Sequence, residues 1–343
     1  MTAAIRPGRD ADAAGFIALI RACWSEYPSI VFDLDGEMGE LRALAGYYAD
    51  AGGALWAAED ATGRLVGMIA VRPETPGTWE ICRLYVDRAQ RGTGLAARLL
   101  ATAEAHAAAD RLVLWSDTRF TRGHRFYEKH SFLRTGPIRP LHDRSHSLEF
   151  GYARPRAGVL ALDAAAAASA VARAAAILID SVAAGARVGF RAPLARATAE
   201  AVWQRIATAV AEGRALLLAG FAEGVLAGVL ALDLATAETA PHRAVLTHLL
   251  VDPAHRRIGL ARALADAAED AAARAGRRLL TVETGGEVAV LRASGWIEAG
   301  RIPGAIGDPG GDLAGDPGGD PGGDAAATIL YRRISGAGPI AAA

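Results

Sequence analysis

The hexapeptide RGTGLA at residues 91–96 has a near copy, RRIGLA, at residues 256–261. Each copy follows an apolar run that ends in Val-Asp and opens an Ala/Leu-rich segment with helical periodicity. The copies are 165 residues apart, as are the Val-Asp pairs at residues 86–87 and 251–252, so the flanks repeat in register. A strand, a turn and a helix N-terminus together form an anion site, because the first N–H groups of a helix lack partners within it. The repeat therefore predicts two similar domains, each with such a turn.

Composition and charge indicate a globular chain of two domains. Its 343 residues, 52% hydrophobic and 22% charged, are enough for two cores, and the net charge of −1 gives no reason to expect a nucleic-acid partner. No apolar run approaches the roughly 20 residues that span a bilayer, and the N-terminus begins no signal peptide, so no membrane partner is expected. Cys23 and Cys82 are expected to be buried free thiols, which suits a cytoplasmic location.

Hydrophobic periodicity predicts an α/β fold in which each half forms a mixed sheet with helices on its faces. In the first half we expect strands at residues 3–6, 54–58, 64–71, 79–86, 112–116, 132–138 and 145–152, and helices at 12–25, 39–50, 94–109 and 122–130. In the second half we expect strands at residues 215–221, 225–232, 244–251, 278–284 and 327–333, and helices at 162–184, 196–212, 259–275 and 288–293. The order of elements therefore repeats.

The predicted domains are residues 1–155 and 156–335, followed by a tail at 336–343. Within the second domain, residues 307–324 repeat Gly-Asp-Pro-Gly-Gly, a composition that builds no core and favours turns. Its carboxylates could suggest calcium, but their spacing matches no calcium loop. We therefore expect a flexible loop there and no metal.

The strand, the Arg/Gln-x-x-Gly-x-Gly/Ala turn and the helix resemble the acetyl-CoA signature of the GCN5-related N-acetyltransferase (GNAT) family. The order of elements is similar to that fold over nearly the whole chain. The resemblance implies two tandem GNAT domains, acetyl-CoA as co-substrate, and a β-bulge before the turn that frees backbone groups for the pantetheine arm. The residues implied for coenzyme binding are Leu84, Tyr85, Val86, Arg91, Gly92, Thr93, Gly94, Leu95 and Ala96 in the first domain, and Leu250, Val251, Arg256, Arg257, Ile258, Gly259, Leu260 and Ala261 in the second.

The two turns differ in their glycines. Gly92 and Gly94 permit positive φ and close backbone approach, so successive N–H groups can converge on a diphosphate, to which Arg91 adds a charge. In the second turn, Arg257 and Ile258 stand where the first has a glycine and a threonine. A turn that caps a helix without binding a ligand is the alternative for both copies. This alternative is more strongly favoured for the second copy than for the first.

The resemblance also implies a catalytic pair in the first domain. Glu80, six residues before Val86, falls where histone acetyltransferases of the family place their general base. Tyr127 falls where the family places the tyrosine that protonates the departing thiolate, and its neutral phenol can donate a proton. The alternatives are an exposed strand glutamate and an aromatic residue that only packs.

The second domain lacks both groups. Val245 stands 165 residues after Glu80, and Leu291 stands opposite Tyr127. His248 could serve as a base on the same strand, although a core or strand histidine is the favoured interpretation. We therefore predict that only the first domain is catalytic, while the second keeps the fold and some coenzyme binding.

These features predict an enzyme that moves an acetyl group from acetyl-CoA directly to a small-molecule amine, with Glu80 as base and Tyr127 as acid. Asp33, Asp35 and Glu37 place carboxylates on the loop that flanks the acceptor cleft of this fold, which favours a cationic amine. A solvated acidic loop is the alternative for that segment.

A non-catalytic acyl-CoA-binding or regulatory tandem GNAT protein is the competing hypothesis. The fused second copy is expected to supply the packing surface that dimers of the family use. The chain is therefore expected to be a monomer with pseudo-dimeric domains or a homodimer.

Overall fold

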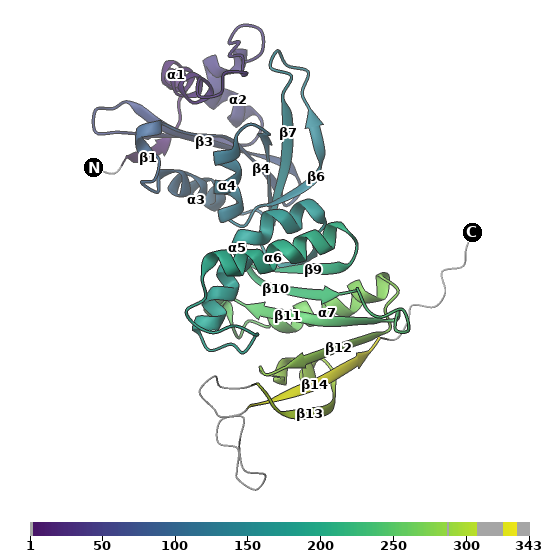
Figure 1. Cartoon of the computed structure of the whole chain (residues 1–343). Coiled ribbons are helices and arrows are strands. Elements are labelled where there is room, and N and C mark those ends of the chain that lie inside the picture. Colours follow the sequence, from purple (N-terminus) through teal and green to yellow (C-terminus); the bar gives the residue numbers. More distant parts are fainter. Residues whose placement is uncertain (1–2, 287, 307–324, 335–343) are drawn as a thin grey trace, which may run out of the picture. The chain divides into compact units, whose positions relative to one another are not determined.

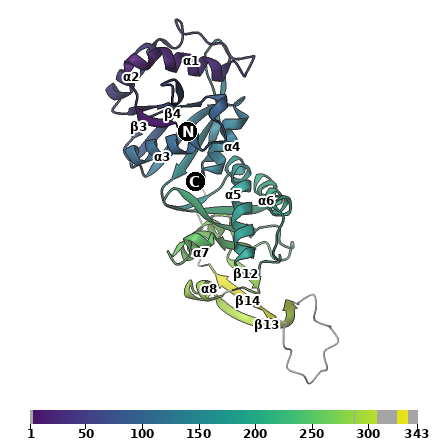
Figure 2. The same cartoon turned by 90° about the vertical axis from the view of Figure 1, so that its left-hand side faces the viewer.

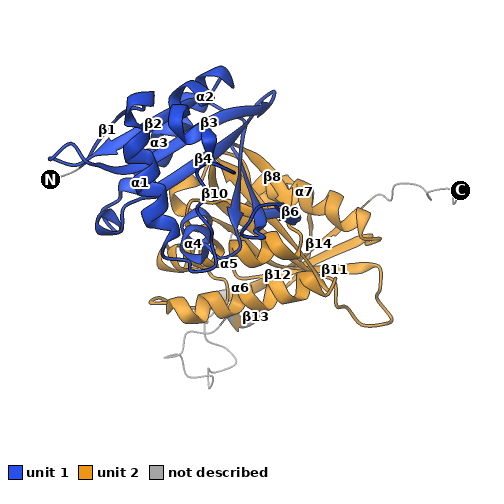
Figure 3. Ribbon diagram, turned by 90° about the horizontal axis from the view of Figure 1, so that it is seen from above, with its two compact units in different colours: residues 1–127, 134–156 blue, residues 128–133, 157–343 orange. Residues whose placement is uncertain are grey.

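Two seven-stranded mixed sheets organise the chain (Figure 1). The structure is a computed structural model that describes residues 3–286, 288–306 and 325–334. Contacts divide the chain into two compact units, residues 1–127 with 134–156 and residues 128–133 with 157–343 (Figure 3). The predicted domain bounds stay a prediction. The predicted loop 307–324 and the tail 336–343 lie outside the described residues.

The sheet of the first unit has the strand order β1-β2-β3-β4-β5-β7-β6. Strands β1 to β4 pair antiparallel, β4 pairs parallel with β5, and β7 pairs antiparallel with β5. The strands are β1 (Ala4–Pro7), β2 (Ala54–Glu59), β3 (Leu65–Thr75), β4 (Thr78–Val86), β5 (Arg111–Asp117), β6 (Leu133–Pro140) and β7 (Leu148–Pro155). The helices are α1 (Ala13–Trp24), α2 (Leu44–Asp50), α3 (Leu95–Ala107) and α4 (Thr121–Lys129), with short 3₁₀ turns η1 (Asp10–Asp12), η2 (Gly39–Ala43) and η3 (Arg88–Gln90).

The second sheet repeats this topology, with the order β8-β9-β10-β11-β12-β14-β13. Its strands are β8 (Gly158–Ala161), β9 (Ala215–Ala222), β10 (Val225–Asp233), β11 (Arg243–Val251), β12 (Leu279–Thr284), β13 (Ile297–Ile306) and β14 (Ala325–Arg333). The helices are α5 (Ala164–Ala183), α6 (Arg196–Ala211), α7 (Leu260–Arg274) and α8 (Ala289–Ala293), with one 3₁₀ turn, η4 (Pro253–His255). Both sheets insert the last strand beside the fifth, which confirms that the two halves share one fold.

Two strands, β8 and β13, were not predicted from the sequence. Both lie at the edges of the second sheet. β8 has only four residues, and β13 contains glycines and Pro303, which interrupt the alternation of apolar and polar residues. The register of β13 against β14 also shifts twice. Irregular edge strands leave little periodic signal to detect.

Neighbouring residues in the first sheet face opposite helical layers. Ala57 and Met68 belong to a core with residues of α1, η2 and α2. Gly67 lies under Leu99 of α3 on the other face. The sheet thus separates α1 and α2 from α3 (Figure 2).

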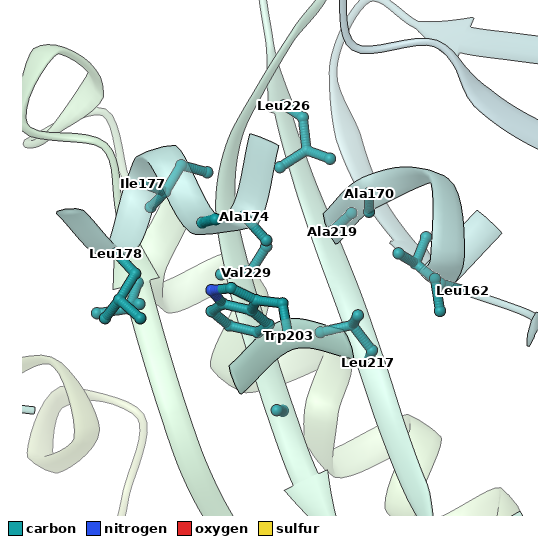
Figure 4. Close-up of a cluster of buried hydrophobic side chains, with 14 of the residues drawn as sticks. Leu162, Ala170, Ala174, Ile177, Leu178, Trp203, Leu217, Ala219, Leu226 and Val229 are labelled. Carbon is teal, nitrogen blue, oxygen red and sulfur yellow. The ribbon is translucent and has the colours of Figure 1, made fainter. Parts of the chain in front are cut away.

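The second unit has the same three layers. On one face of its sheet, Trp203 of α6 is fully buried and packs with α5 residues and the inner sides of β9 and β10 (Figure 4). Leu260 and Leu264 of α7 cover Gly220 and Gly228 on the opposite face. Truncation of a buried tryptophan typically costs about 3–5 kcal/mol, so this cluster is a main source of stability.

α5 meets the length and composition criteria of a membrane span, with 20 residues and a mean hydropathy of 1.5. The expectation that no apolar run approaches this length is therefore wrong. Ala170, Ala174, Ile177 and Leu178 of α5 lie in the core around Trp203 (Figure 4). A buried core helix of this kind satisfies the same criteria without a membrane.

Candidate active site

β4 bulges and separates from β5 partway along its length. Its register against β3 shifts between Met68 and Ala70, which leaves one extra residue on β4 and Arg83 at a φ of 51°. Parallel pairing joins only residues 78–80 of β4 to residues 111–113 of β5. Among the described residues, the rest of β4 has no ladder partner on β5, so backbone groups on that edge are open to a ligand. The expected bulge is present.

β11 repeats this opening in the second unit. Only residues 243–245 pair with residues 279–281 of β12. The register against β10 shifts so that Thr247 is the extra residue. Glu80 and Val245 both occupy the third pair of their ladders, which confirms that they are equivalent positions.

The turns after these strands share one backbone conformation. Gly92 and Gly94 have φ of 80° and 84°, and Arg257 and Gly259 have φ of 67° and 83°. Gly94 and Gly259 are the N-caps of α3 and α7. A left-handed conformation costs a non-glycine residue roughly 1–2 kcal/mol, so Arg257 is strained. The second turn therefore keeps the shape of the first in spite of its sequence.

The side chain of Arg91 is bound to a carboxylate. Its Nη1 and Nη2 donate to the two carboxylate oxygens of Glu26 at 2.8 and 2.6 Å, and its Nε lies 3.4 Å from the Val86 carbonyl oxygen. The same carbonyl accepts from the Cys23 thiol at 3.6 Å. The Val86 carbonyl expected to meet the pantetheine arm thus already has two donors near it.

Glu80 lies opposite Arg72, its antiparallel partner on β3. Arg72 Nε and Nη2 are 2.8 and 2.6 Å from Glu80 Oε2, and the carboxylate side chain is 15% exposed. Arg72 was not predicted from the sequence. The feature that could have indicated it is the pairing register of β3 and β4, which places Arg72 beside Glu80.

Tyr127 lies on α4, and its ring centroid is 5.9 Å from that of Tyr152 on β7. Burial, and then the neighbouring Tyr85 and Cys82, raise the pKa of the Tyr127 phenol. Burial, and then the charge of Glu80, raise the pKa of the Cys82 thiol to about 12. Cys82 is therefore within electrostatic reach of both predicted catalytic residues.

Arg83 was also missed by the sequence analysis. Its Nη2 lies 2.5 Å from Glu40 Oε1. The Tyr48 hydroxyl is in the same cluster, and burial raises its pKa. A positive φ at an arginine is costly and is typical of functional positions. No local signal predicts it, because the strain results from the bulge.

The three predicted rim carboxylates are all engaged with arginines. Asp33 Oδ2 lies 2.8 Å from Arg144 Nη1, and Glu37 accepts from the Arg144 backbone N–H at 2.7 Å. Asp35 pairs with Arg42. The contacts of Asp33 and Glu37 join the loop to the segment between β6 and β7, and two of the three carboxylates, Asp33 and Asp35, pair with a guanidinium.

The second unit has apolar or packed residues at the catalytic positions. Leu291 is 4% exposed in the core, and its helix α8 has only five residues. The His248 ring lies beside that of Trp203, with centroids 5.2 Å apart and planes tilted by 53°, and burial lowers the pKa of its imidazole. His248 therefore lies against the core, as the favoured interpretation had it.

Comparisons with known proteins agree with this geometry. The model of the acetyltransferase (GNAT) family matches residues 16–132 and 187–291. A search among curated proteins finds no relative of this chain.

Three solved structures to which the chain is similar each match less than half of it. A GNAT-family acetyltransferase of Staphylococcus aureus Mu50 is 18% identical, with a TM-score of 0.40, over 45% of this chain and 98% of its own. An acetyltransferase of Streptococcus agalactiae 2603 is 18% identical, with a TM-score of 0.38, over 44% and 98%. The PaiA N-acetyltransferase of Thermoplasma acidophilum, in complex with coenzyme A, is 16% identical, with a TM-score of 0.33, over 44% and 98%.

Proposed function

This chain belongs to the acetyltransferase (GNAT) family, and on that premise we propose that its first unit transfers an acetyl group from acetyl-CoA to the amine of a small molecule. The opening between β4 and β5 supports this proposal most strongly, because the unpaired part of β4 leads directly into the turn at the N-terminus of α3. A pantetheine arm can pair with such an edge, and a diphosphate suits a helix N-terminus.

Two residues of the first unit carry the proton transfers. Acetyl-CoA supplies the thioester whose acyl group is moved. Glu80 takes the proton of the acceptor amine, and Arg72 holds its carboxylate in place through Oε2. Tyr127 donates a proton to the thiolate as it leaves, and the raised pKa keeps its phenol protonated at neutral pH.

The second unit binds rather than catalyses. It retains the strand opening and the turn, but Val245 and Leu291 offer no base and no acid. Proximity alone can sustain some transfer, but without the rate gain of a positioned base and acid.

A free-thiol assay across a panel of amines tests the proposal. The expected result is acetyl-CoA-dependent thiol release with at least one amine and a higher melting temperature with acetyl-CoA, because a ligand that binds only the native state stabilises it. A raised melting temperature without thiol release from any amine would favour the non-catalytic acyl-CoA-binding function. An unchanged melting temperature together with no release would contradict both.

A further inference from the structure

The Glu26 carboxylate accepts hydrogen bonds from the arginines beside the first turn. Glu26 lies two residues after α1, and both of its carboxylate oxygens accept from Arg91, at 2.8 and 2.6 Å. Arg122, in the first turn of α4, adds a contact of 3.1 Å to Oε2. Two arginines from separate elements thus converge on one anion, which is a common way to bind phosphate groups.

The Glu26–Arg91 pair is partly shielded from water. The Glu26 and Arg91 side chains are 22% and 27% exposed. The hydrogen bond from Arg91 is the main cause that lowers the pKa of Glu26, so its carboxylate is charged at neutral pH. A bidentate pair of this kind is stronger than an isolated surface pair.

The second turn has no equivalent carboxylate. The residue two positions after α5 is Gly185. Arg256 and Arg257 are exposed, and within the described ranges neither pairs with an acidic side chain. The contact with Glu26 is therefore specific to the unit that carries the predicted catalytic residues.

We propose that Glu26 is an internal competitor for the diphosphate of acyl-CoA, holding Arg91 and Arg122 in the free protein and releasing them when the diphosphate binds. This inference rests on the proposed function, because it requires the first turn to bind acyl-CoA. Glu26 thereby sets the affinity of the first unit for donors that carry phosphates. Pantetheine, which has none, does not meet this competition.

Calorimetric titration of the full-length protein with coenzyme A and with pantetheine tests the inference. Glu26→Gln should tighten coenzyme A binding about tenfold, which corresponds to about 1.4 kcal/mol, and leave the affinity for pantetheine unchanged. Glu149→Gln is the matched control, since Glu149 pairs with Arg139 at 2.6 Å on the β6–β7 hairpin. It should change neither affinity.

Unchanged or weaker coenzyme A binding by Glu26→Gln would overturn the inference. Unchanged binding would mean that Glu26 has no effect on the affinity, and weaker binding would mean that it positions Arg91 for the ligand. A crystal structure of the unaltered protein with coenzyme A gives a second test that does not depend on folding of the variant. The Glu26–Arg91 pair should be broken there, and an intact pair beside a bound diphosphate would refute the competition. If neither protein binds coenzyme A, the proposed function itself fails and this inference fails with it.

Discussion

Arg72 and Glu80 face each other across β3 and β4, with Arg72 Nη2 2.6 Å from Glu80 Oε2. No hydrogen bond to Glu80 Oε1 is found among the described residues. One carboxylate oxygen is thus held by the guanidinium while the other remains for an amine. The ion pair and the base function can therefore be separated by mutation.

Glu80→Gln should lower kcat/KM for thiol release by about 10²- to 10⁴-fold, because the amide cannot accept the amine proton. Arg72→Gln breaks the same ion pair but keeps the carboxylate, and it should cost less than about tenfold in kcat/KM because the base itself remains. Glu59→Gln, which breaks a strand pair with Arg6, is the control and should have no effect on the rate. Equal losses in the Glu80 and Arg72 variants would mean that the ion pair, not the base, matters.

Tyr127→Phe should lower kcat by about 10²-fold or more, since it removes the proton donor and keeps the ring. Because burial raises the pKa of Tyr127 above its ordinary value of 10.0, the phenol keeps its proton across the usual assay range. In the unaltered enzyme, kcat should therefore show no loss from tyrosine ionisation up to about pH 10. Tyr331→Phe, in the second unit, should leave kcat unchanged, and a similar loss there would contradict the assignment.

Arg257→Gly should stabilise the second unit by up to about 1 kcal/mol, because glycine adopts the φ of 67° without the strain of an L side chain. The neighbouring Arg256 has a φ of −74°, where glycine brings only the entropy cost of a more flexible unfolded chain. Arg256→Gly should therefore destabilise slightly. Calorimetric melting of both variants tests the difference, and the opposite order would show that the strain is relieved elsewhere.

His248 should make the second unit less stable in acid. Burial lowers the pKa of its imidazole in the folded state, so below the ordinary histidine pKa of 6.5 the unfolded chain binds the proton more readily. This contribution to stability is present above pH 6.5 and is lost as the pH falls toward the lowered folded pKa.

The pH dependence of the melting temperature between about pH 7 and 5 measures this effect. His248→Gln should flatten the curve, whereas His242→Gln, at an exposed histidine, should leave it unchanged. An unchanged slope in the His248 variant would contradict burial of a neutral imidazole.

Most of the fold was accessible from the sequence because its signals are local. The strand before each turn, the turn and the helix after it lie within about 30 residues, and their periodicity identifies them. β8 and β13 escaped detection because one is short and the other is broken by glycines and Pro303. The expectation that no apolar run approaches the length of a membrane span was wrong at α5. Its many alanines raise the mean hydropathy enough to meet the criterion for a span.

The candidate site was only partly accessible. Glu80 and Tyr127 were identified through a family pattern, and both lie within electrostatic reach of Cys82 on β4. Arg83 and Arg72 were not identified, because their importance depends on a bulge and on a cross-strand neighbour. The acidic loop was predicted to favour a cationic amine, and this stays a prediction; the sequence did not indicate that Asp33 and Asp35 pair with arginines or that Glu37 accepts from the Arg144 backbone N–H.

The sequence by itself determined the duplication, the order of the elements and the loss of acid and base groups from the second copy, since these depend on residue identity and short-range spacing. Only the tertiary structure decided which charges meet. Arg91 binds Glu26 from 65 residues away, and Arg144 binds Asp33 from 111 residues away. Electrostatic interaction depends on distance through space, which spacing along the chain does not specify.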